Sequence, residues 1–529
     1  MRKILRQHKG EYMKKSKLSL VAALALTTGL QAADIKYDER LGITTAVDQG
    51  YTERKEKEST IVFDGQLRFW YQTMDHGGTV GGQSDKGLFR RDTNMGNEWG
   101  NVEAQFSISG QVNERLKAKG TFMAVSTMGM ENLIVVGQTA RTGAQGALDG
   151  RSAQPFWVHE AYLDYLLTEN TDVKVGRMEL DTPLIYTEKW NATANSFEAI
   201  TATNTDLANT TITAAYVAKG NGAQQNLRAA PQVFGAEATF NSLMGYADVG
   251  SPNAGGALVL GATSKAIDFM PVQAWGYAIQ DAAMGYWLQA DPSVKNVGPL
   301  DSAALSLVAG GLGTQGATER YLQNNPMGKP TVGGVPGQWD QTGDQTQMTH
   351  ALAAKIGATA GIFNAYAAAS SVSKGNLPVA NIGTNFKKTK LPTASVFNDG
   401  MVVAQPDTNT WKVGGGAKFE GIGTLNVSYG SSTVGQNGGY QNPNAAAGGP
   451  AGMGWIVQNY MNESLTVNEF DIIFNTKVKD VDIAAMYIKV NNTYVPRLGA
   501  GGGPAAGEAF ANYGEFSNDI VRIVATLKF

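Results

Sequence analysis

The chain ends on an amphipathic strand whose last residue is aromatic. In the final ten residues, IVRIVATLKF, apolar side chains occupy every second position back from Phe529, while Lys528 and Arg522 fall on the other face. This alternation is typical of a β-strand with one apolar side. In a transmembrane β-barrel the last strand pairs with the first, which leaves no open edge in lipid. The alternative is the terminal strand of a soluble sheet.

The amino terminus resembles a secretory signal. Lysines at positions 14, 15 and 17 precede an apolar run, and Ala32 and Ala33 follow it. The run is shorter than the ~20 residues of a membrane-spanning helix, so it predicts a cleaved signal peptide. We expect residues 1–33 to be this peptide, with 1–12 as an upstream extension. A periplasmic lead-in over 34–59 and a barrel with long extracellular loops over 60–529 would follow.

The composition excludes several classes of protein. The chain has no cysteine, hence no disulfide, thiolate metal site or Cys nucleophile. Segments after the signal are too interrupted for a helical membrane protein. The most apolar of them, residues 351–372, is interpreted as two strands that meet near 358–361, with a buried helix as the alternative.

The charge balance of the mature chain is acidic. Residues 1–32 carry seven Lys or Arg and one Glu, and their removal from the 43 basic and 46 acidic residues leaves 36 and 45. This balance offers no broad basic surface for nucleic acid. If it were concentrated in a pore, it would favour cations.

Several segments alternate over nearly the length of a tilted barrel strand. The clearest is 101–112, in which Val102, Phe106 and Ile108 share one face and Glu103 lies on the other. Arg68 and Lys117 occupy the polar faces of similar segments. The pattern predicts that Arg68, Glu103 and Lys117 face a water-filled lumen, although a soluble sandwich would alternate in the same way.

The connections alternate between long and short. Short turns are expected at 113–115, 167–171, 420–423 and 479–481, and long loops separate the strand pairs. Short periplasmic turns and long external loops give this rhythm, with both termini on the periplasmic side. Between 219 and 310 the short connections near Met270, Ala282 and Ser293 are too close together for it. The length suits 16 to 18 strands.

Aromatic residues cluster toward the predicted strand ends, for example at Trp70 with Tyr71 and Trp275 with Tyr277. They would form interfacial girdles in a barrel. Ordinary strand propensity explains them equally well.

The most specific motif lies in the third predicted long connection, residues 179–209. The segment from Val173 to Leu207 contains Gly176-Arg177, an acidic residue, Asp-Thr-Pro-Leu from Asp181, and Asn-x-Phe-Glu-Ala from Asn195. It resembles the signature of the OprD-like outer-membrane porins, in particular the major outer-membrane porins of epsilonproteobacteria. The strand HEAYLDY before it is similar to that group as well.

This resemblance implies an 18-stranded antiparallel barrel, often trimeric, whose third loop folds into the lumen. Opposed charges across such a narrow, low-dielectric neck would orient polar solutes and filter ions by sign. The expected constriction residues are Lys174, Arg177, Glu179, Asp181, Glu188, Lys189 and Asp206. Pro183 would stiffen the loop. Ordinary solvated loop charges are the alternative.

Other chemistry has weak support in the sequence. Residues 311–316, GLGTQG, match a dinucleotide-binding pattern, but no βαβ unit surrounds them, and chance in a glycine-rich loop explains the match. No two histidines have metal-ligand spacing. No cofactor is expected, although acidic loops could hold calcium through oxygen ligands.

We therefore expect an outer-membrane porin for passive diffusion of small hydrophilic solutes and ions, with a mild cation preference and no enzymatic activity. Its expected partners are membrane lipid, the barrel-assembly machinery through the strand ending at Phe529, and two further copies in a homotrimer. A channel specific for small acids, amino acids or peptides is the first alternative. A loop-mediated adhesin and a phospholipase using His159 or His350 are the others.

Overall fold

The computed structural model describes the strands of the wall and much of what joins them. The described residues are 61–76, 79–80, 83–84, 87–89, 98–126, 156–189, 193–221, 256–316, 331–332, 335–336, 348–375, 377–384, 386, 388–400, 402–435, 465–493 and 515–529. The predicted signal peptide and lead-in, and most of the predicted external loops, lie outside them.

The main sheet is a closed antiparallel barrel of 18 wall strands. Its first half contains β1 (Val62–His76), β4 (Glu98–Asn113), β5 (Leu116–Ser126), β6 (Phe156–Thr168), β7 (Thr171–Met178), β8 (Phe197–Asn204), β9 (Thr210–Gly220), β10 (Ala257–Ser264) and β11 (Val272–Ile279). Its second half contains β12 (Ala283–Ala290) with β13 (Ser293–Val297), β14 (Leu300–Thr314), β17 (Thr349–Ala360), β18 (Phe363–Val372), β19 (Thr408–Phe419), β20 (Gly423–Val434), β21 (Leu465–Val478), β22 (Val481–Thr493) and β23 (Glu515–Lys528). Two small ribbons, β2 (Thr79–Val80) with β3 (Gln83–Ser84) and β15 (Thr331–Val332) with β16 (Val335–Pro336), lie outside this sheet.

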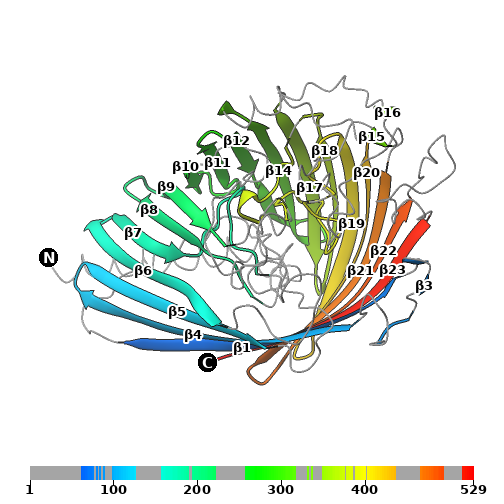
Figure 1. The fold of residues 1–529 in the computed structure, drawn as a ribbon, viewed down its shortest axis with the longest axis horizontal. Helices are drawn as coiled ribbons and strands as arrows, with labels where there is room; N and C mark the ends of the chain where they lie inside the picture. Colours follow the sequence, from blue (N-terminus) through cyan, green and yellow to red (C-terminus); the bar gives the residue numbers. More distant parts are fainter. Residues whose placement is uncertain are drawn as a thin grey trace.

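The last strand closes the wall, as its sequence predicts. β23 pairs with β1 from Gln66 opposite Lys528 to His76 opposite Asn518, so the strands form a complete ring (Figure 1). Gly65 and Phe529 exchange two backbone hydrogen bonds of 2.8 and 3.1 Å at the seam. A Cβ on Gly65 would lie 2.9 Å from the Phe529 ring. A larger residue would therefore displace this ring.

One wall strand is interrupted, which explains the irregular spacing between 219 and 310. Both β12 and β13 pair with β14, and Pro292 lies in the two-residue break between them. Proline lacks the N–H that a central ladder position needs. The connection near Ser293 is therefore a break within one strand. The β11–β12 connection at Ala282 is a genuine but very short external turn, and Met270 lies in a periplasmic turn.

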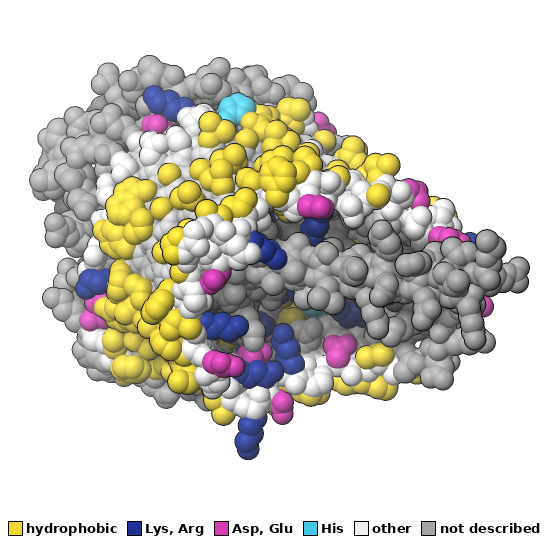
Figure 2. Space-filling model, turned by 180° about the vertical axis from the view of Figure 1, so that it is seen from behind, with side chains coloured by type: hydrophobic (Ala, Val, Ile, Leu, Met, Phe, Trp, Pro, Cys, Tyr) yellow, Lys and Arg dark blue, Asp and Glu magenta, His cyan; other side chains and the backbone are white. Residues whose placement is uncertain are grey.

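Apolar and polar side chains are distributed between the outer and inner faces of the wall as the alternation predicts. On β23, Val521, Ile523 and Leu527 face outward, while Arg522 is buried on the inner side. Exposed apolar side chains cover much of the outer surface (Figure 2). Among the described residues, no helix has the length and apolar character needed to cross a bilayer.

The aromatic residues serve both sides of the wall. Trp70 and Trp287 are fully buried on the inner side, and Trp275 is nearly so. Trp411 and Tyr429 face outward and pack with their ring centroids 5.6 Å apart. Several aromatic residues that suggested an interfacial girdle are therefore part of the packing inside the barrel.

The segment 351–372 forms two strands, β17 and β18, as predicted, with Gly361 at φ +57° in the turn between them. The predicted third long connection is shorter than expected. Only residues 179–196 leave the wall, and residues 197–204 form β8. Phe197 and Ala199 are buried inside the barrel while Ile200 is exposed outside. The polar residues of this strand concealed its alternation.

Candidate channel constriction

A first inner loop, described over residues 179–189 and 193–196, leaves β7 and folds back on itself inside the barrel. Across its base, the Thr187 N–H donates a 2.7 Å hydrogen bond to the Leu180 carbonyl. At its tip the Thr182 hydroxyl donates a 2.8 Å bond to the Ile185 carbonyl and accepts a 3.2 Å bond from the Ile185 N–H. Pro183 fixes its own φ within this turn. The loop is therefore a self-bonded finger.

The tip of the finger is apolar and packs against the wall. Leu184 and Ile185 are fully buried in a cluster that also contains Trp287 of β12. The Leu184 N–H donates a 3.2 Å bond to the Tyr277 hydroxyl of β11. Apolar packing and this hydrogen bond thus hold the finger inside the barrel, as the family resemblance implied.

A second inner loop connects β18 and β19, and its described residues, 373–375, 377–384, 386, 388–400 and 402–407, also lie inside the ring (Figure 1). Its apolar residues Leu377, Val379 and Ile382 are fully buried in the same cluster. Farther along, the Phe397 and Asn398 N–H groups donate to the Glu469 carboxylate of β21. This loop is thereby fixed to two parts of the wall.

The two inner loops are locked together through Asn381 of the second loop. Its side-chain oxygen accepts a 3.1 Å bond from the Tyr186 N–H, and its Nδ2 donates to the Tyr186 carbonyl at 2.9 Å. The same Nδ2 lies 3.0 Å from Glu188 Oε1, which also accepts a bond from the Thr384 hydroxyl. All four residues are fully buried, so the interlock excludes water.

A cluster of three ionisable side chains lies at the base of the finger. Glu179 binds Lys189 Nζ at 2.5 Å and His159 Nε2 at 2.9 Å. Burial alone would raise the pKa of the Glu179 carboxyl, but the Lys189 ammonium and the His159 ring outweigh burial and hold it well below its usual range. The Glu179 carboxylate raises the pKa of Lys189 in turn. Side-chain exposure of 45% for Lys189 and 25% for Glu179 leaves both charges accessible to solvent.

Two further pairs extend this charged surface. Lys390 of the second loop pairs with Asp181 of the first, and its ammonium lies 4.9 Å from the Tyr186 ring centroid. On the wall, Lys119 binds Glu160 at 2.6 Å. Because Asp181 and Lys119 keep side-chain exposures of 34% and 29%, the channel surface presents both signs of charge.

A third pair is enclosed within the second loop. Lys388 Nζ lies 2.6 Å from Asp399 Oδ2, and Asp399 Oδ1 accepts bonds from the N–H groups of Thr389 and Gly400. Burial raises the pKa of Asp399 to about 6, against the opposing effect of Lys388. This pair holds the fold of the loop.

The predicted wall residues Arg68, Glu103 and Lys117 all lie on inner faces. Arg68 Nη1 is 3.5 Å from Glu103 Oε2, and both residues are buried. Lys117 lies opposite Asp164 in the β5–β6 register. On the adjacent strand β23, the Arg522 guanidinium lies 5.0 Å from the Trp70 ring centroid and 5.3 Å from the Phe397 ring centroid.

The predicted constriction residues are not all brought together. Glu179, Asp181, Glu188 and Lys189 are in the first inner loop, and Lys174 is on the inner face of β7, 5.9 Å from the Tyr162 ring centroid. Asp206 lies elsewhere, in the exposed β8–β9 turn at the periplasmic end, where bonds from Asn204 and Asn170 lower its pKa. Because residues 197–204 form the wall strand β8, Asp206 lies after that strand and not in the inner loop.

Arg177 also differs in position from the expectation. It pairs in register with Ala161 and Glu198, which share the outer face with Val175 and Ile200. Its guanidinium donates to the Val158 carbonyl at 2.7 Å and binds Glu198 at 3.1 Å. In a strand of period two, Arg177 cannot share a face with Lys174.

The second inner loop, like strand β8, was not predicted from the sequence. Its residues 378–399 contain three lysines, at 387, 388 and 390, and no acidic residue before Asp399. Lys390 and Lys388 meet Asp181 and Asp399 only after folding, so sequence spacing did not indicate the pairs. The length of the connection was the only available signal.

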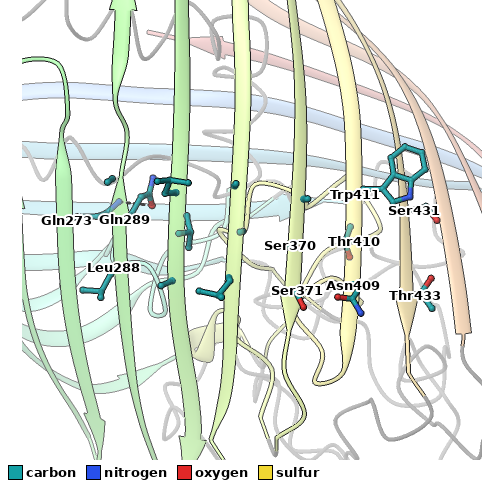
Figure 3. Close-up of a pocket in the computed structure, with 18 residues that line it drawn as sticks. Gln273, Leu288, Gln289, Ser370, Ser371, Asn409, Thr410, Trp411, Ser431 and Thr433 are labelled. Atoms are coloured by element: carbon teal, nitrogen blue, oxygen red, sulfur yellow. Dashed lines mark hydrogen bonds between the residues drawn. The ribbon is translucent and has the colours of Figure 1, made fainter.

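A shallow groove of about 920 Å³ lies away from this constriction. Figure 3 shows its lining on adjacent strands, with Leu288 on β12, Ser371 on β18, and Asn409 and Trp411 on β19. Leu288 and Trp411 are about half exposed, and no described residue of the inner loops lines the groove. The groove is therefore a feature of the outer surface.

The comparisons with known proteins agree with this architecture. The chain matches no protein-family model and no curated protein. Its structure is similar to Pseudomonas aeruginosa OccK8 (OprE), with a TM-score of 0.59 and 12% identity over 89% of this chain and 98% of that one. For P. aeruginosa OpdK with vanillate the values are 0.57 and 12%, over 89% and 99%. For P. aeruginosa OpdQ they are 0.56 and 10%, over 89% and 98%. The chain therefore has the fold of the OprD-like porins.

Proposed function

We propose that this chain is an outer-membrane porin of a Gram-negative bacterium, a water-filled channel for passive diffusion of small hydrophilic solutes and ions. One observation carries the proposal: two inner loops interlock inside a closed barrel, with the charges of Glu179, Lys189 and Asp181 still accessible. A barrel of this strand number without inner loops would pass small solutes with little discrimination. The interlocked loops would provide the narrow, charged passage.

Single-channel recording in a planar lipid bilayer tests this function. The purified, folded barrel should give discrete ohmic conductance steps. Folded protein that inserts into lipid without conductance would reject the proposal and favour the adhesin. Detergent-solubilised hydrolase activity lost on His159→Ala would favour an enzyme instead.

The expected mild cation preference is part of the proposal. It rests on the acidic balance of the mature chain and on the accessible Asp181 and Glu179 carboxylates. The neighbouring Lys189 and Lys119 limit the preference because they present the opposite charge nearby. A reversal potential of anionic sign in a salt gradient would contradict it.

A channel specific for small acids is the second candidate. The ammonium groups of Lys119 and Lys189, whose side chains are 29% and 45% exposed, are suitable partners for a carboxylate. The similar OpdK structure contains vanillate, which is an aromatic acid. Saturable, competable flux of such an acid in liposomes would select this candidate, whereas flux proportional to concentration would select the general porin.

We further propose association as a homotrimer and assembly by the barrel-assembly machinery through the strand that ends at Phe529. A closer relationship to the epsilonproteobacterial porins rests on the motif from Gly176 to Ala199 and stays a prediction. No cofactor is needed for diffusion, and calcium remains a proposed ligand of the acidic external loops. A thermal transition that falls on chelation and returns with calcium would support that ligand.

A further inference from the structure

The external ends of β7, β8 and β9 carry a row of charged side chains on the outside of the barrel. Arg177 lies directly opposite Glu198 in the β7–β8 register, and Glu198 lies opposite Lys219 in the β8–β9 register. The Arg177 and Glu198 side chains are 3.1 Å apart, with exposures of 26% and 40%, and Lys219 is exposed. The row has two positive charges and one negative charge.

The next row toward the periplasm on the same outer face is apolar. It consists of Val175, Ile200 and Tyr216, which are 47%, 49% and 43% exposed. The inward neighbours of the charged row, Met178 and Phe197, are buried. On β7, β8 and β9 the charged row therefore borders the apolar surface on its external side, whereas on neighbouring β6 the exposed Phe156 extends that surface farther out.

The position of Arg177 is fixed by the backbone of β6. The β5–β6 register shifts next to Val158, and the Val158 carbonyl accepts a 2.7 Å bond from Arg177 Nη1. A guanidinium bound to a carbonyl and a carboxylate has lost much of its freedom to turn toward water. Lys219, on its flexible stem, can reach upward from the same row.

A second described cluster of charged side chains, on β22, β23 and β1, has the opposite net sign. Lys489 of β22 lies 3.4 Å from Asp519 of β23, and Asp75 of β1 is opposite Asp519 in register. This group has two negative charges and one positive charge. These two places on the outer surface, both near external strand ends, therefore differ in the net charge that they present to membrane lipids.

We propose that the row Arg177, Glu198 and Lys219 binds the phosphate of a lipid in the external leaflet. Arg177 and Lys219 would donate charge-assisted hydrogen bonds to the phosphate oxygens. The acyl chains of this lipid would pack on Val175, Ile200 and Tyr216. Basic groups at the membrane surface attract anionic head groups in this way, while Glu198 limits the affinity by opposing the phosphate.

Lipid binding to the purified barrel in neutral detergent tests this site, with diphosphoryl lipid A as the probe and the dephosphorylated lipid as its comparison. Native mass spectrometry should show retention of the phosphorylated lipid by the unaltered chain. Lys219→Gln should weaken binding about fivefold, the effect of one basic residue near a lipid surface. Arg177→Gln should weaken it at least as much, and Glu198→Gln should strengthen it.

Lys489→Gln is the matched control, because Lys489 is also outward and near the external end but lies in the acidic group. It should leave binding unchanged. Equal loss in Lys489→Gln and Lys219→Gln, equal binding of both lipids, or weaker binding in Glu198→Gln would overturn the proposal. Full displacement by inorganic phosphate would assign the site to a free anion instead. If Arg177→Gln fails to fold, the exposed Lys219 and Glu198 variants still decide.

Discussion

Asn381 and Tyr186 bind each other through both hydrogen-bonding atoms of one amide side chain, although 195 positions separate them in the sequence. The Tyr186 N–H and carbonyl are both satisfied by this one residue. The peptide of the first inner loop is thereby paired as if with a neighbouring strand. Because all of these groups are buried, neither loop can leave without exposing the other's polar backbone.

Asn381→Ala should release the two inner loops from each other. Each lost buried hydrogen bond contributes about 1 kcal/mol, and the Glu188 and Tyr186 groups left unpaired cost more. We expect a lower thermal transition and a larger, noisier single-channel conductance. Asn170→Ala, in an exposed periplasmic turn, is the control. Identical conductance in Asn381→Ala and the unaltered chain would show that the interlock does not set the aperture.

Glu179→Gln and Asp181→Asn should each shift the reversal potential toward anion preference. Each removes a carboxylate and leaves a lysine, Lys189 or Lys390, without its opposing charge. Asp206→Asn removes the same charge from the β8–β9 turn and should have a much smaller effect. Equal shifts in all three variants would mean that total charge, and not the inner loops, controls selectivity.

Stability should depend on pH through Asp399. Its pKa of about 6 in the folded chain lies above the ordinary value of 3.8, so the folded state holds this proton more tightly than the unfolded state. The free energy of unfolding should therefore rise as pH falls from 7 toward 4, by at most roughly 3 kcal/mol. This contribution is lost as pH rises through 6. Thermal transitions of Asp399→Asn should show a flatter pH dependence, and an unchanged profile would contradict this assignment.

Gly65→Ala should impair closure of the barrel. An added Cβ would lie 2.7 Å from the Gln105 carbonyl oxygen and 2.9 Å from the Phe529 ring, so the seam would have to shift. Gly120→Ala, whose Cβ meets no atom within 4 Å, is the matched control. The folded fraction, measured by heat-modifiable electrophoretic mobility, should fall for Gly65→Ala only. Equal yields of the two variants would dismiss the seam as a steric constraint.

The wall was largely predictable from sequence because its physics is local. Period-two alternation identified β4 and β23, and turn residues separated β17 from β18. β8 was missed because its inner face alternates small and polar residues with Phe197. The interior was less predictable, since the pairing of Lys390 with Asp181 depends on two loops from distant parts of the chain. The side of the wall on which Arg177 lies depended on the register of β7, which the motif alone did not supply.

The paired inner loops have a mechanical consequence. They originate from the β7–β8 and β18–β19 connections, which are nearly half a circumference apart in the strand order, and the second loop also binds Glu469 on β21. Together they connect nearly opposite sides of the barrel wall across its interior. A hollow cylinder flattens easily under lateral pressure, but one with a rigid strut inside keeps its cross-section. The bore should therefore stay constant when the surrounding bilayer is compressed or stretched.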